Sequence, residues 1–245
     1  MATVVHYGPF FLTGRPGAMG ADTDIDDLPD DASAIAKELA KEWVHRAAYR
    51  AEDERNRRGG KKALADLEDT PVGAEAQGVR SPARSLVGAL AKVPYFARPT
   101  MAVAEYVINR DLREVSAYLA NTDGIRDKAQ KLAATQIGAD TKVVIGHSLG
   151  SVVAYEACHR LGHPLPLLIT LGSPLGLDTI VYHKIVPQPP AYPGKVGWWV
   201  NAADPDDIVA AEPKLAGRFA APEGKQLTDH RVDNGWSAHE AAQYL

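Results

Sequence analysis

The chain has 245 residues, a mass of 26.3 kDa and a formal net charge of −4. This length allows one well-filled domain, and a balance of 45% hydrophobic and 24% charged residues is typical of a globular protein. The charge gives no basic footprint, so nucleic acid is not expected as a partner. A single cysteine, Cys158, excludes an intramolecular disulfide and a cysteine-based zinc site.

Neither the N-terminus nor the apolar windows indicate a membrane or export segment. Residues 1–6 lack a basic region followed by a long apolar core, which is the pattern of a signal peptide. The most apolar long window, residues 86–108, is interrupted by charged residues and prolines and is not expected to span a bilayer. We therefore expect a soluble, cytoplasmic protein.

The N-terminal part is expected to hold one short strand followed by helices. Residues 3–6 form a β-branched run, which predicts a buried strand. Apolar residues then recur every four positions between Ile35 and Ala47, which predicts an amphipathic helix. This pattern fades in a charged run, and the helix is expected to stop at Gly59-Gly60.

The middle of the chain is the least regular part. Residues 60–82 are small, polar and punctuated by glycine and proline, so they are expected to be flexible. Residues 85–119 are apolar but broken by prolines, which predicts short helices, and residues 123–137 have helical spacing. Within a single domain of residues 1–245, residues 60–120 are expected to form a cap or lid insertion over an acyl pocket, with plain core packing as the alternative.

The last hundred residues alternate between apolar runs and helical patterns. Runs that are apolar throughout and alternate with helices are typical of a parallel sheet covered on both faces. The sequence therefore predicts an α/β fold with a mostly parallel central sheet flanked by helices. The expected strands are residues 142–145, 167–171 and 196–200, and the expected helices are residues 149–161 and 237–244.

A Gly-x-Ser-x-Gly pattern lies between the first of these strands and the helix that follows it. It reads Gly146-His147-Ser148-Leu149-Gly150. A serine at such a junction sits on a tight turn whose backbone leaves no room for Cβ atoms two residues to either side. The turn exposes the serine hydroxyl to a neighbouring base and aims the N–H of the next residue at a developing oxyanion. The pattern predicts Ser148 as a nucleophile and the Leu149 N–H as an oxyanion donor.

This junction and two later runs resemble a known superfamily. The segment 146–157 resembles α/β-hydrolases, while the runs 170–176 and 199–210 resemble their lipase-like branch, which includes triacylglycerol lipases, GPI inositol-deacylase-like proteins and DDHD-type phospholipases. The resemblance covers roughly residues 140–245 and does not cover residues 10–120. It implies an α/β-hydrolase fold with a catalytic triad in the chain order serine, acid, histidine.

Two histidines lie late enough in the chain to act as the base. We favour His239, which opens the expected terminal helix after a loop, over His230, which lies in an extended run. The acid candidates follow the expected third strand, apart from Asp178, which follows the second. Alignment with the family pattern places the acid at Asp207, with Asp204 as second choice and an Asx turn as the alternative role of Asp204. The candidates are Asp178, Asp204, Asp206 and Asp207.

A second oxyanion donor is expected from the loop after the first strand. Pro9 has no N–H, so Gly8 or Phe10 is the expected donor. His6 in the same loop is expected to be structural, and His147 inside the elbow is expected to pack beside the sheet. The remaining histidines lack metal-ligand spacing.

These residues together predict a serine hydrolase that cleaves carboxylic esters through an acyl-enzyme intermediate. The expected substrate is a small-molecule or lipid ester, and neither a cofactor nor a metal is expected. An acyl thioesterase is the first alternative, because the elbow also resembles type II thioesterases. A non-catalytic binding module of the same fold is the second. The sequence does not determine the oligomeric state.

Overall fold

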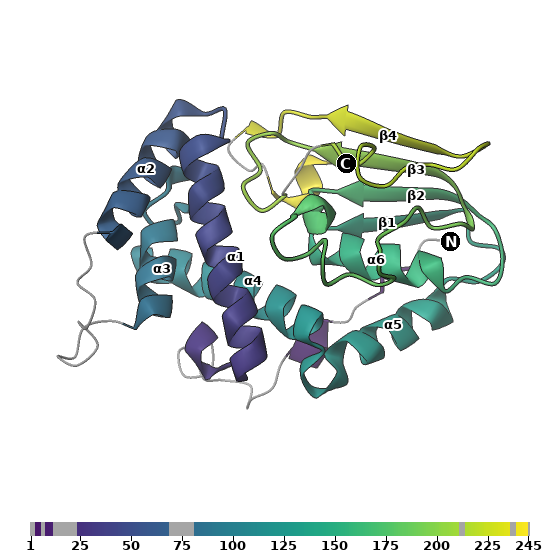
Figure 1. The fold of residues 1–245 in the computed structure, drawn as a ribbon, viewed down its shortest axis with the longest axis horizontal. Coiled ribbons are helices and arrows are strands. Elements are labelled where there is room, and N and C mark those ends of the chain that lie inside the picture. Colours follow the sequence, from purple (N-terminus) through teal and green to yellow (C-terminus); the bar gives the residue numbers. More distant parts are fainter. Residues whose placement is uncertain are drawn as a thin grey trace. The chain divides into compact units, whose positions relative to one another are not determined.

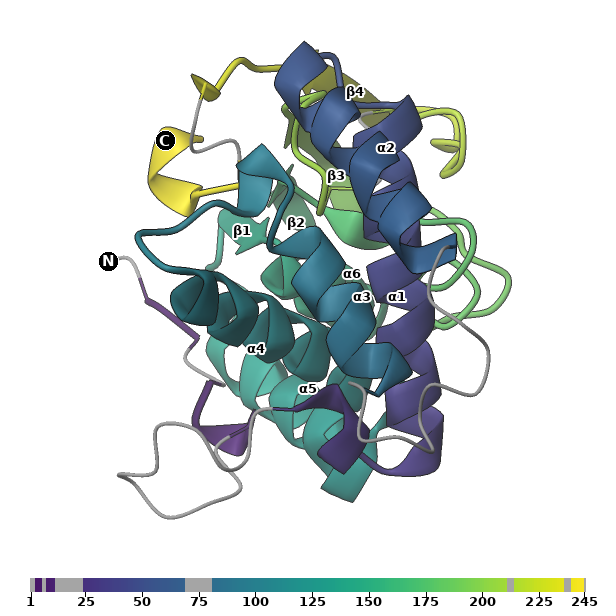
Figure 2. The same ribbon diagram turned by 90° about the vertical axis from the view of Figure 1, so that its left-hand side faces the viewer.

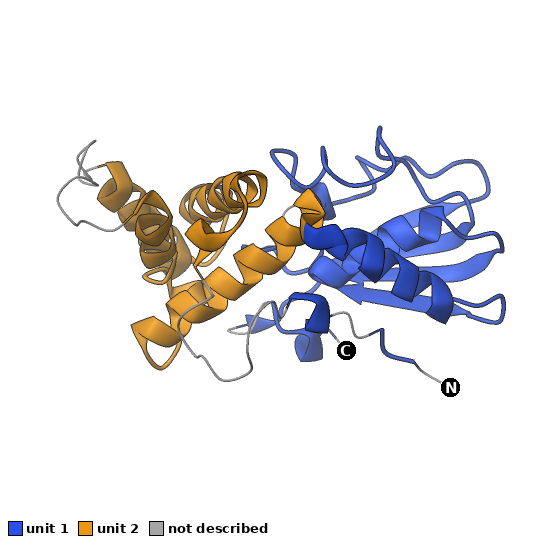
Figure 3. Ribbon diagram, turned by 90° about the horizontal axis from the view of Figure 1, so that it is seen from below, with its two compact units in different colours: residues 1–12, 123–245 blue, residues 13–122 orange. Residues whose placement is uncertain are grey.

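The computed structural model describes residues 3–5, 8–11, 24–68, 81–210, 214–235 and 239–244. It divides into two compact units (Figure 3). Unit 1 comprises residues 1–12 and 123–245, and unit 2 comprises residues 13–122. The helical part that precedes the nucleophile strand therefore begins well before residue 60.

Unit 1 is a mixed α/β unit built on a parallel sheet. Within the described residues the sheet has four strands in the order β1-β2-β3-β4, and each neighbouring pair is parallel (Figure 1). Helix α6 contacts β1 and β2, and α5 packs on α6. The elements are β1 (Val143–His147), β2 (Leu165–Leu171), β3 (Val196–Ala203), β4 (Gln226–Arg231), α5 (Ile125–Gln136) and α6 (Leu149–His159).

The sheet face that carries Trp199 holds the core of unit 1. Trp199 is fully buried, and its ring lies 5.7 Å from that of Tyr155 in α6 and 5.1 Å from that of Phe219. Its indole N–H donates to the Thr170 hydroxyl at 2.9 Å, and Thr170 donates in turn to Asn201 Oδ1 at 2.9 Å. These buried side-chain bonds fix β2 against β3, because a buried polar group without a partner would be costly.

The opposite face of the same sheet is partly open. Val143, Ile145 and Trp198 are 42%, 54% and 44% exposed. The strand register pairs Val143 with Leu167 and Leu167 with Trp198, so these side chains lie on one face. The expectation that both faces are covered therefore does not hold for the part of the chain that the structure describes.

Unit 2 contains a group of helices around α1, which contacts α2, α3 and α4 (Figure 2). Apolar residues between 86 and 96 fill this core. For example, Leu90 and Val93 are fully buried, and the Phe96 ring stacks on Trp43 at 5.8 Å. Core packing thus accounts for most of the apolar residues that suggested an acyl pocket. The helices are α1 (Asp30–Tyr49), α2 (Glu54–Glu68), α3 (Pro82–Leu90) and α4 (Met101–Ala120), with two short 3-10 helices, η2 (Ile25–Asp27) and η4 (Pro94–Phe96).

The predicted helix stop at Gly59-Gly60 is wrong, because both glycines lie inside α2. A Cβ atom on Gly60 would lie 2.5 Å from the Ala47 carbonyl carbon in α1 and closer still to the Ala48 nitrogen. The glycine therefore serves close packing of two helices and does not end one. Here a tertiary contact overrides local propensity.

Two predictions at the chain ends also need correction. Residues 3–5 form no strand, and Val4 is 86% exposed, while His6 and Tyr7 lie outside the described residues. In place of the α-helix expected at 237–244, the described residues 239–244 hold a turn and the 3-10 helix η8 (Ala241–Gln243). Across the described ranges, no helix combines the length and apolar character needed to cross a membrane.

The contact at Gly60 can be tested by substitution. In an uncrowded helix, replacing glycine by alanine gains about 1 kcal/mol. We expect Gly60→Ala to lower the free energy of unfolding instead, by about 1–3 kcal/mol, because the methyl group forces α1 and α2 apart. Denaturant unfolding followed by circular dichroism measures this change. Gly162→Ala, where a Cβ would meet open space, is the control. A stabilised Gly60→Ala variant would contradict the packing argument.

Candidate active site

Ser148 lies on a strained turn between β1 and α6. It has φ of 50° and ψ of −128°, and positive φ is rare for a residue with a side chain. A Cβ on Gly146 would lie 2.6 Å from both the Gly150 oxygen and the Ser151 Cα, so only glycine fits there. The backbone N–H of Ser148 donates to Leu171 O at 3.0 Å, which ties the turn to the end of β2. The turn thus has the tight form that the sequence pattern predicts.

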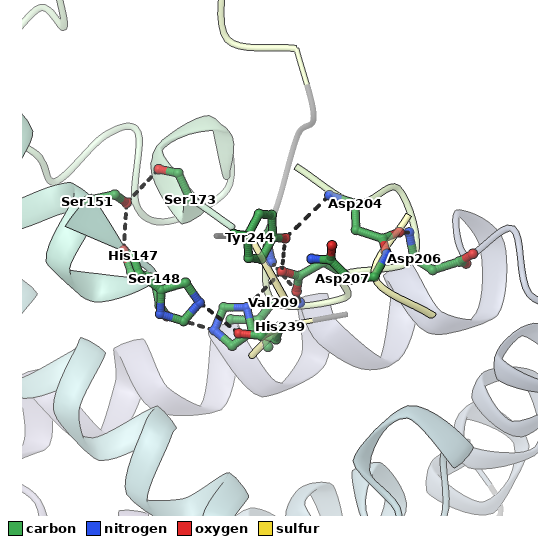
Figure 4. A network of polar contacts seen from close by, with 12 residues as sticks. His147, Ser148, Ser151, Ser173, Asp204, Asp206, Asp207, Val209, His239 and Tyr244 are labelled. Atoms are coloured by element: carbon green, nitrogen blue, oxygen red, sulfur yellow. Dashed lines mark hydrogen bonds and ion pairs between the residues drawn. The ribbon is translucent and has the colours of Figure 1, made fainter. Parts of the chain in front are cut away.

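The imidazole of His239 joins Ser148 to Asp207 (Figure 4). Its Nε2 lies 2.8 Å from Ser148 Oγ, and its Nδ1 lies 2.7 Å from Asp207 Oδ2. A carboxylate only accepts hydrogen bonds, so Nδ1 carries the hydrogen. In the neutral ring Nε2 is then free to accept the hydroxyl hydrogen of Ser148. This is the tautomer that a general base for Ser148 requires.

Asp207 is fully buried in the loop that follows β3. Its Oδ1 accepts the backbone N–H groups of Val209 and Ala210, both at 3.0 Å, which leaves Oδ2 to face His239. The carboxylate is therefore oriented by its own loop. A charge buried to this degree is tolerated only when it is hydrogen-bonded in this way.

Asp204 lies in the same loop but takes a different role. Its Oδ1 accepts the Asp206 N–H at 2.8 Å in an Asx turn, and its Oδ2 accepts the Asn234 N–H at 2.7 Å. This second bond ties the loop after β3 to the segment that leads to His239. Burial raises the pKa of Asp204, against the effect of these two N–H groups. Asp204 is thus a structural acceptor, and the alternative role considered for it, an Asx turn, is the one observed.

The structure separates the other predicted candidates from the Ser148 hydroxyl. His230 is exposed in β4, where it pairs in register with Ala202. Asp178 forms an ion pair with Arg218. Asp206 points its carboxylate away from the group of side chains at Asp207 (Figure 4).

The two predicted oxyanion donors lie in different elements of unit 1. Leu149 is the first residue of α6, and a backbone N–H in the first turn of a helix has no intrahelical partner. Its N–H therefore has no acceptor within α6, and its role as an oxyanion donor stays a prediction. Gly8 and Phe10 both lie in the 3-10 helix η1 (Gly8–Phe11), which packs on α5. The role of Gly8, or of Phe10 in its place, stays a prediction, and His6 lies outside the described residues.

Three residues at this site were not assigned a role in it by sequence. The Tyr244 hydroxyl lies 3.0 Å from Asp207 Oδ2, and the His147 Nε2 donates to the backbone oxygen of His239 at 2.7 Å. Gly172, with φ of 52°, lies close to Asp207 and Tyr244. A Cβ there would lie 2.9 Å from Asp207 Oδ2 and 3.2 Å from the Tyr244 hydroxyl. These contacts join segments far apart in the chain, so no local sequence pattern predicts them.

Comparisons of the chain with protein-family models, with curated proteins and with solved structures found no match. The chemical interpretation of the site therefore depends on its own geometry. That geometry is a hydroxyl on a strained turn, a ring nitrogen placed to accept its hydrogen, and a buried carboxylate behind the ring. Such an arrangement is suited to nucleophilic catalysis.

The role of Asp204 predicts a pH-dependent stability. A carboxyl group with a raised pKa holds its proton in the folded chain where the unfolded chain has released it. Its contribution to the free energy of unfolding is therefore full in acid and is lost as the pH rises through the folded pKa. Asp204→Asn removes this titration and one acceptor of a backbone N–H. We expect the variant to be less stable by about 1–3 kcal/mol near pH 4.

The difference between the parent chain and Asp204→Asn should then shrink as the pH rises. Denaturant titrations at several pH values measure it, and Asp206→Asn in the same turn controls for the change of net charge. A difference that grows with pH would show that the Asp204 carboxylate is favoured in its charged form, contrary to this argument.

Proposed function

We propose that the chain is a serine hydrolase of the α/β-hydrolase class that cleaves carboxylic esters. The observation that carries the proposal is the continuous series of contacts from Ser148 through His239 to Asp207, with distances of 2.8 and 2.7 Å. The strained backbone of Ser148 supports it, because strain of this kind is concentrated at functional sites. The parallel sheet also places these residues at the carboxyl ends of its strands, where α/β folds bind ligands.

Each residue has a defined task in this mechanism. His239 Nε2 takes the hydroxyl proton as Ser148 Oγ attacks the ester carbonyl carbon, and the carbonyl oxygen becomes the oxyanion of a tetrahedral intermediate. The resulting imidazolium gives its proton to the leaving alcohol as the carbon–oxygen bond breaks, which leaves an acyl-serine. Water then attacks the acyl group in the same manner and releases the acid and the free hydroxyl. Asp207 stays ionised and holds the tautomer of His239 throughout.

The developing oxyanion is stabilised by backbone N–H groups. Leu149 at the start of α6 supplies the first, and the positive end of the helix dipole adds to it. We assign the second donor to the η1 segment, at Gly8. One such donor typically contributes about 2.7–4 kcal/mol of transition-state stabilisation.

The central test combines a covalent probe with variants of the triad. A fluorophosphonate should label the parent chain and leave Ser148→Ala unlabelled, with Ser85→Ala as a control serine. Asp207→Asn should keep an oxygen toward Val209 and Ala210 but turn an NH2 group toward His239. That group forces the wrong ring tautomer, so kcat should fall by about 10⁴ with little change in folding.

The matched control for the acid is Asp206→Asn, which should retain activity. A panel of p-nitrophenyl esters of increasing chain length and the corresponding acyl-CoA thioesters supplies the substrates, so the same experiment separates an esterase from a thioesterase. Labelling that persists in Ser148→Ala would refute the proposal, and a folded chain that no probe labels would favour a non-catalytic binding module.

Gly172 provides a second test of the site geometry. Alanine there adds backbone strain at positive φ and places a methyl group 2.9 Å from Asp207 Oδ2. We expect kcat of Gly172→Ala to fall by about 10- to 100-fold, because the acid is displaced from His239. Gly224→Ala is the control, since it has φ of 75° but open space around its Cβ. Gly224→Ala shares the backbone strain but not the close contacts, so it should lose less stability than Gly172→Ala and keep its kcat. Equal kcat values in the two variants would contradict the proposed role of Gly172.

A further inference from the structure

The Tyr244 hydroxyl contacts the carboxylate oxygen that serves the base. Its Oη lies 3.0 Å from Asp207 Oδ2, and His239 Nδ1 lies 2.7 Å from the same oxygen (Figure 4). The other oxygen, Oδ1, is held by the backbone of the loop after β3. Tyr244 therefore acts on the side of the carboxylate that faces the ring.

A second contact fixes the direction of the phenol hydrogen. The Asp204 N–H approaches Tyr244 Oη at 3.4 Å as a donor, while Asp207 only accepts. A phenol carries one hydrogen, so that hydrogen points to Asp207 Oδ2. Burial and the neighbouring Asp207 charge raise the pKa of Tyr244 far above its ordinary value. The phenol is therefore a donor throughout the neutral range.

The ring of Tyr244 also contacts the residue that holds the backbone of the base. It lies 5.9 Å from the His147 ring, and His147 donates to the His239 carbonyl oxygen at 2.7 Å. Among the residues that the structure describes, the titratable groups that face this cluster include His147 at the end of β1, His239, and the carboxyl groups of Asp204 and Asp207 in the loop after β3. Tyr244 thus contacts both Asp207 itself and His147, the residue that holds the backbone of His239.

We propose that Tyr244 is a positioning residue of the triad, whose hydroxyl holds Asp207 Oδ2 in line with His239 Nδ1 and partly neutralises its charge. This inference rests on the proposed function. Two measurable consequences follow. Loss of the hydroxyl frees Oδ2 to move, which impairs proton transfer at His239. It also leaves the carboxylate more strongly negative, which stabilises the charged ring.

The test compares Tyr244→Phe with Tyr192→Phe. The Tyr192 hydroxyl donates to the backbone oxygen of Gln226, the first residue of β4, so its loss removes a hydrogen bond of the same hydroxyl type outside the triad. Nitrogen NMR of isotope-labelled histidine rings follows the titration of His239 without any substrate, and a His239→Gln spectrum identifies its signals among those of the eight histidines. In Tyr244→Phe the pKa of His239 should rise by about 0.5–1 unit, whereas Tyr192→Phe should leave it unchanged.

Kinetics give the second measurement. Tyr244→Phe should lower kcat by about tenfold with KM almost unchanged, and the acid limb of its pH–rate profile should move to higher pH with the ring. A ring-fluorinated tyrosine at position 244 keeps the shape and donates more strongly, so it should move the limb to lower pH. This variant also serves if phenylalanine impairs folding.

The outcomes are separable from those of the proposed function. A pKa of His239 and a kcat that are both unchanged in Tyr244→Phe overturn the positioning role. An equal shift in Tyr192→Phe overturns it as well, because the effect would then be general. If the folded chain hydrolyses neither oxygen esters nor thioesters but the His239 pKa still rises in Tyr244→Phe, hydrolysis is refuted and the contact of Tyr244 with the Asp207–His239 pair is supported.

Discussion

The geometry of the site depends on the turn between β1 and α6, where Gly146 has room for nothing larger than a hydrogen atom. This constraint sets the path of the chain through Ser148. Backbone hydrogen bonds then fix that turn relative to the neighbouring strands. Ser148 N–H donates to Leu171 O at the end of β2, and Gly172 N–H donates to Ala202 O near the end of β3. These two hydrogen bonds join the end of β1 to that of β2 and the end of β2 to that of β3. The loop after β3, which carries Asp207, therefore starts from the same edge of the sheet.

Parallel strands bring their carboxyl ends to one edge, and this explains how residues far apart in the chain meet. Ser148 follows β1, Gly172 follows β2, and Asp207 follows β3, while His239 arrives after β4. The loop after β3 and the segment before His239 are then joined through Asp204 and Asn234. The triad proposed here is therefore a property of the sheet order as much as of its individual residues.

The elements of unit 1 could be predicted from sequence where the signal is local. Three strands and helix α6 were predicted close to their observed bounds, because each is a continuous apolar run flanked by turn residues. His239 was preferred to His230 because it opens the expected terminal helix after a loop; the structure has no α-helix there but shows His239 beside Ser148. Contacts that form only between distant segments of the folded chain could not be predicted from the sequence. Tyr244 has no pattern around it, and Gly60 resembled a helix stop because the approach of α1 is invisible in the sequence.

The hydrogen bonds around Asp207 have a consequence for how the site responds to charge. An ionised carboxylate offers about four acceptor positions. Two backbone N–H groups, a ring N–H and a phenol contact its two oxygens, so the protein supplies donors that water would otherwise provide. Water dipoles must reorient when a positive charge appears beside them, whereas donors fixed by a loop, a ring and a tyrosine already have their final orientation. The free energy needed to orient the dipoles around this carboxylate is thus spent during folding, before the His239 ring becomes charged.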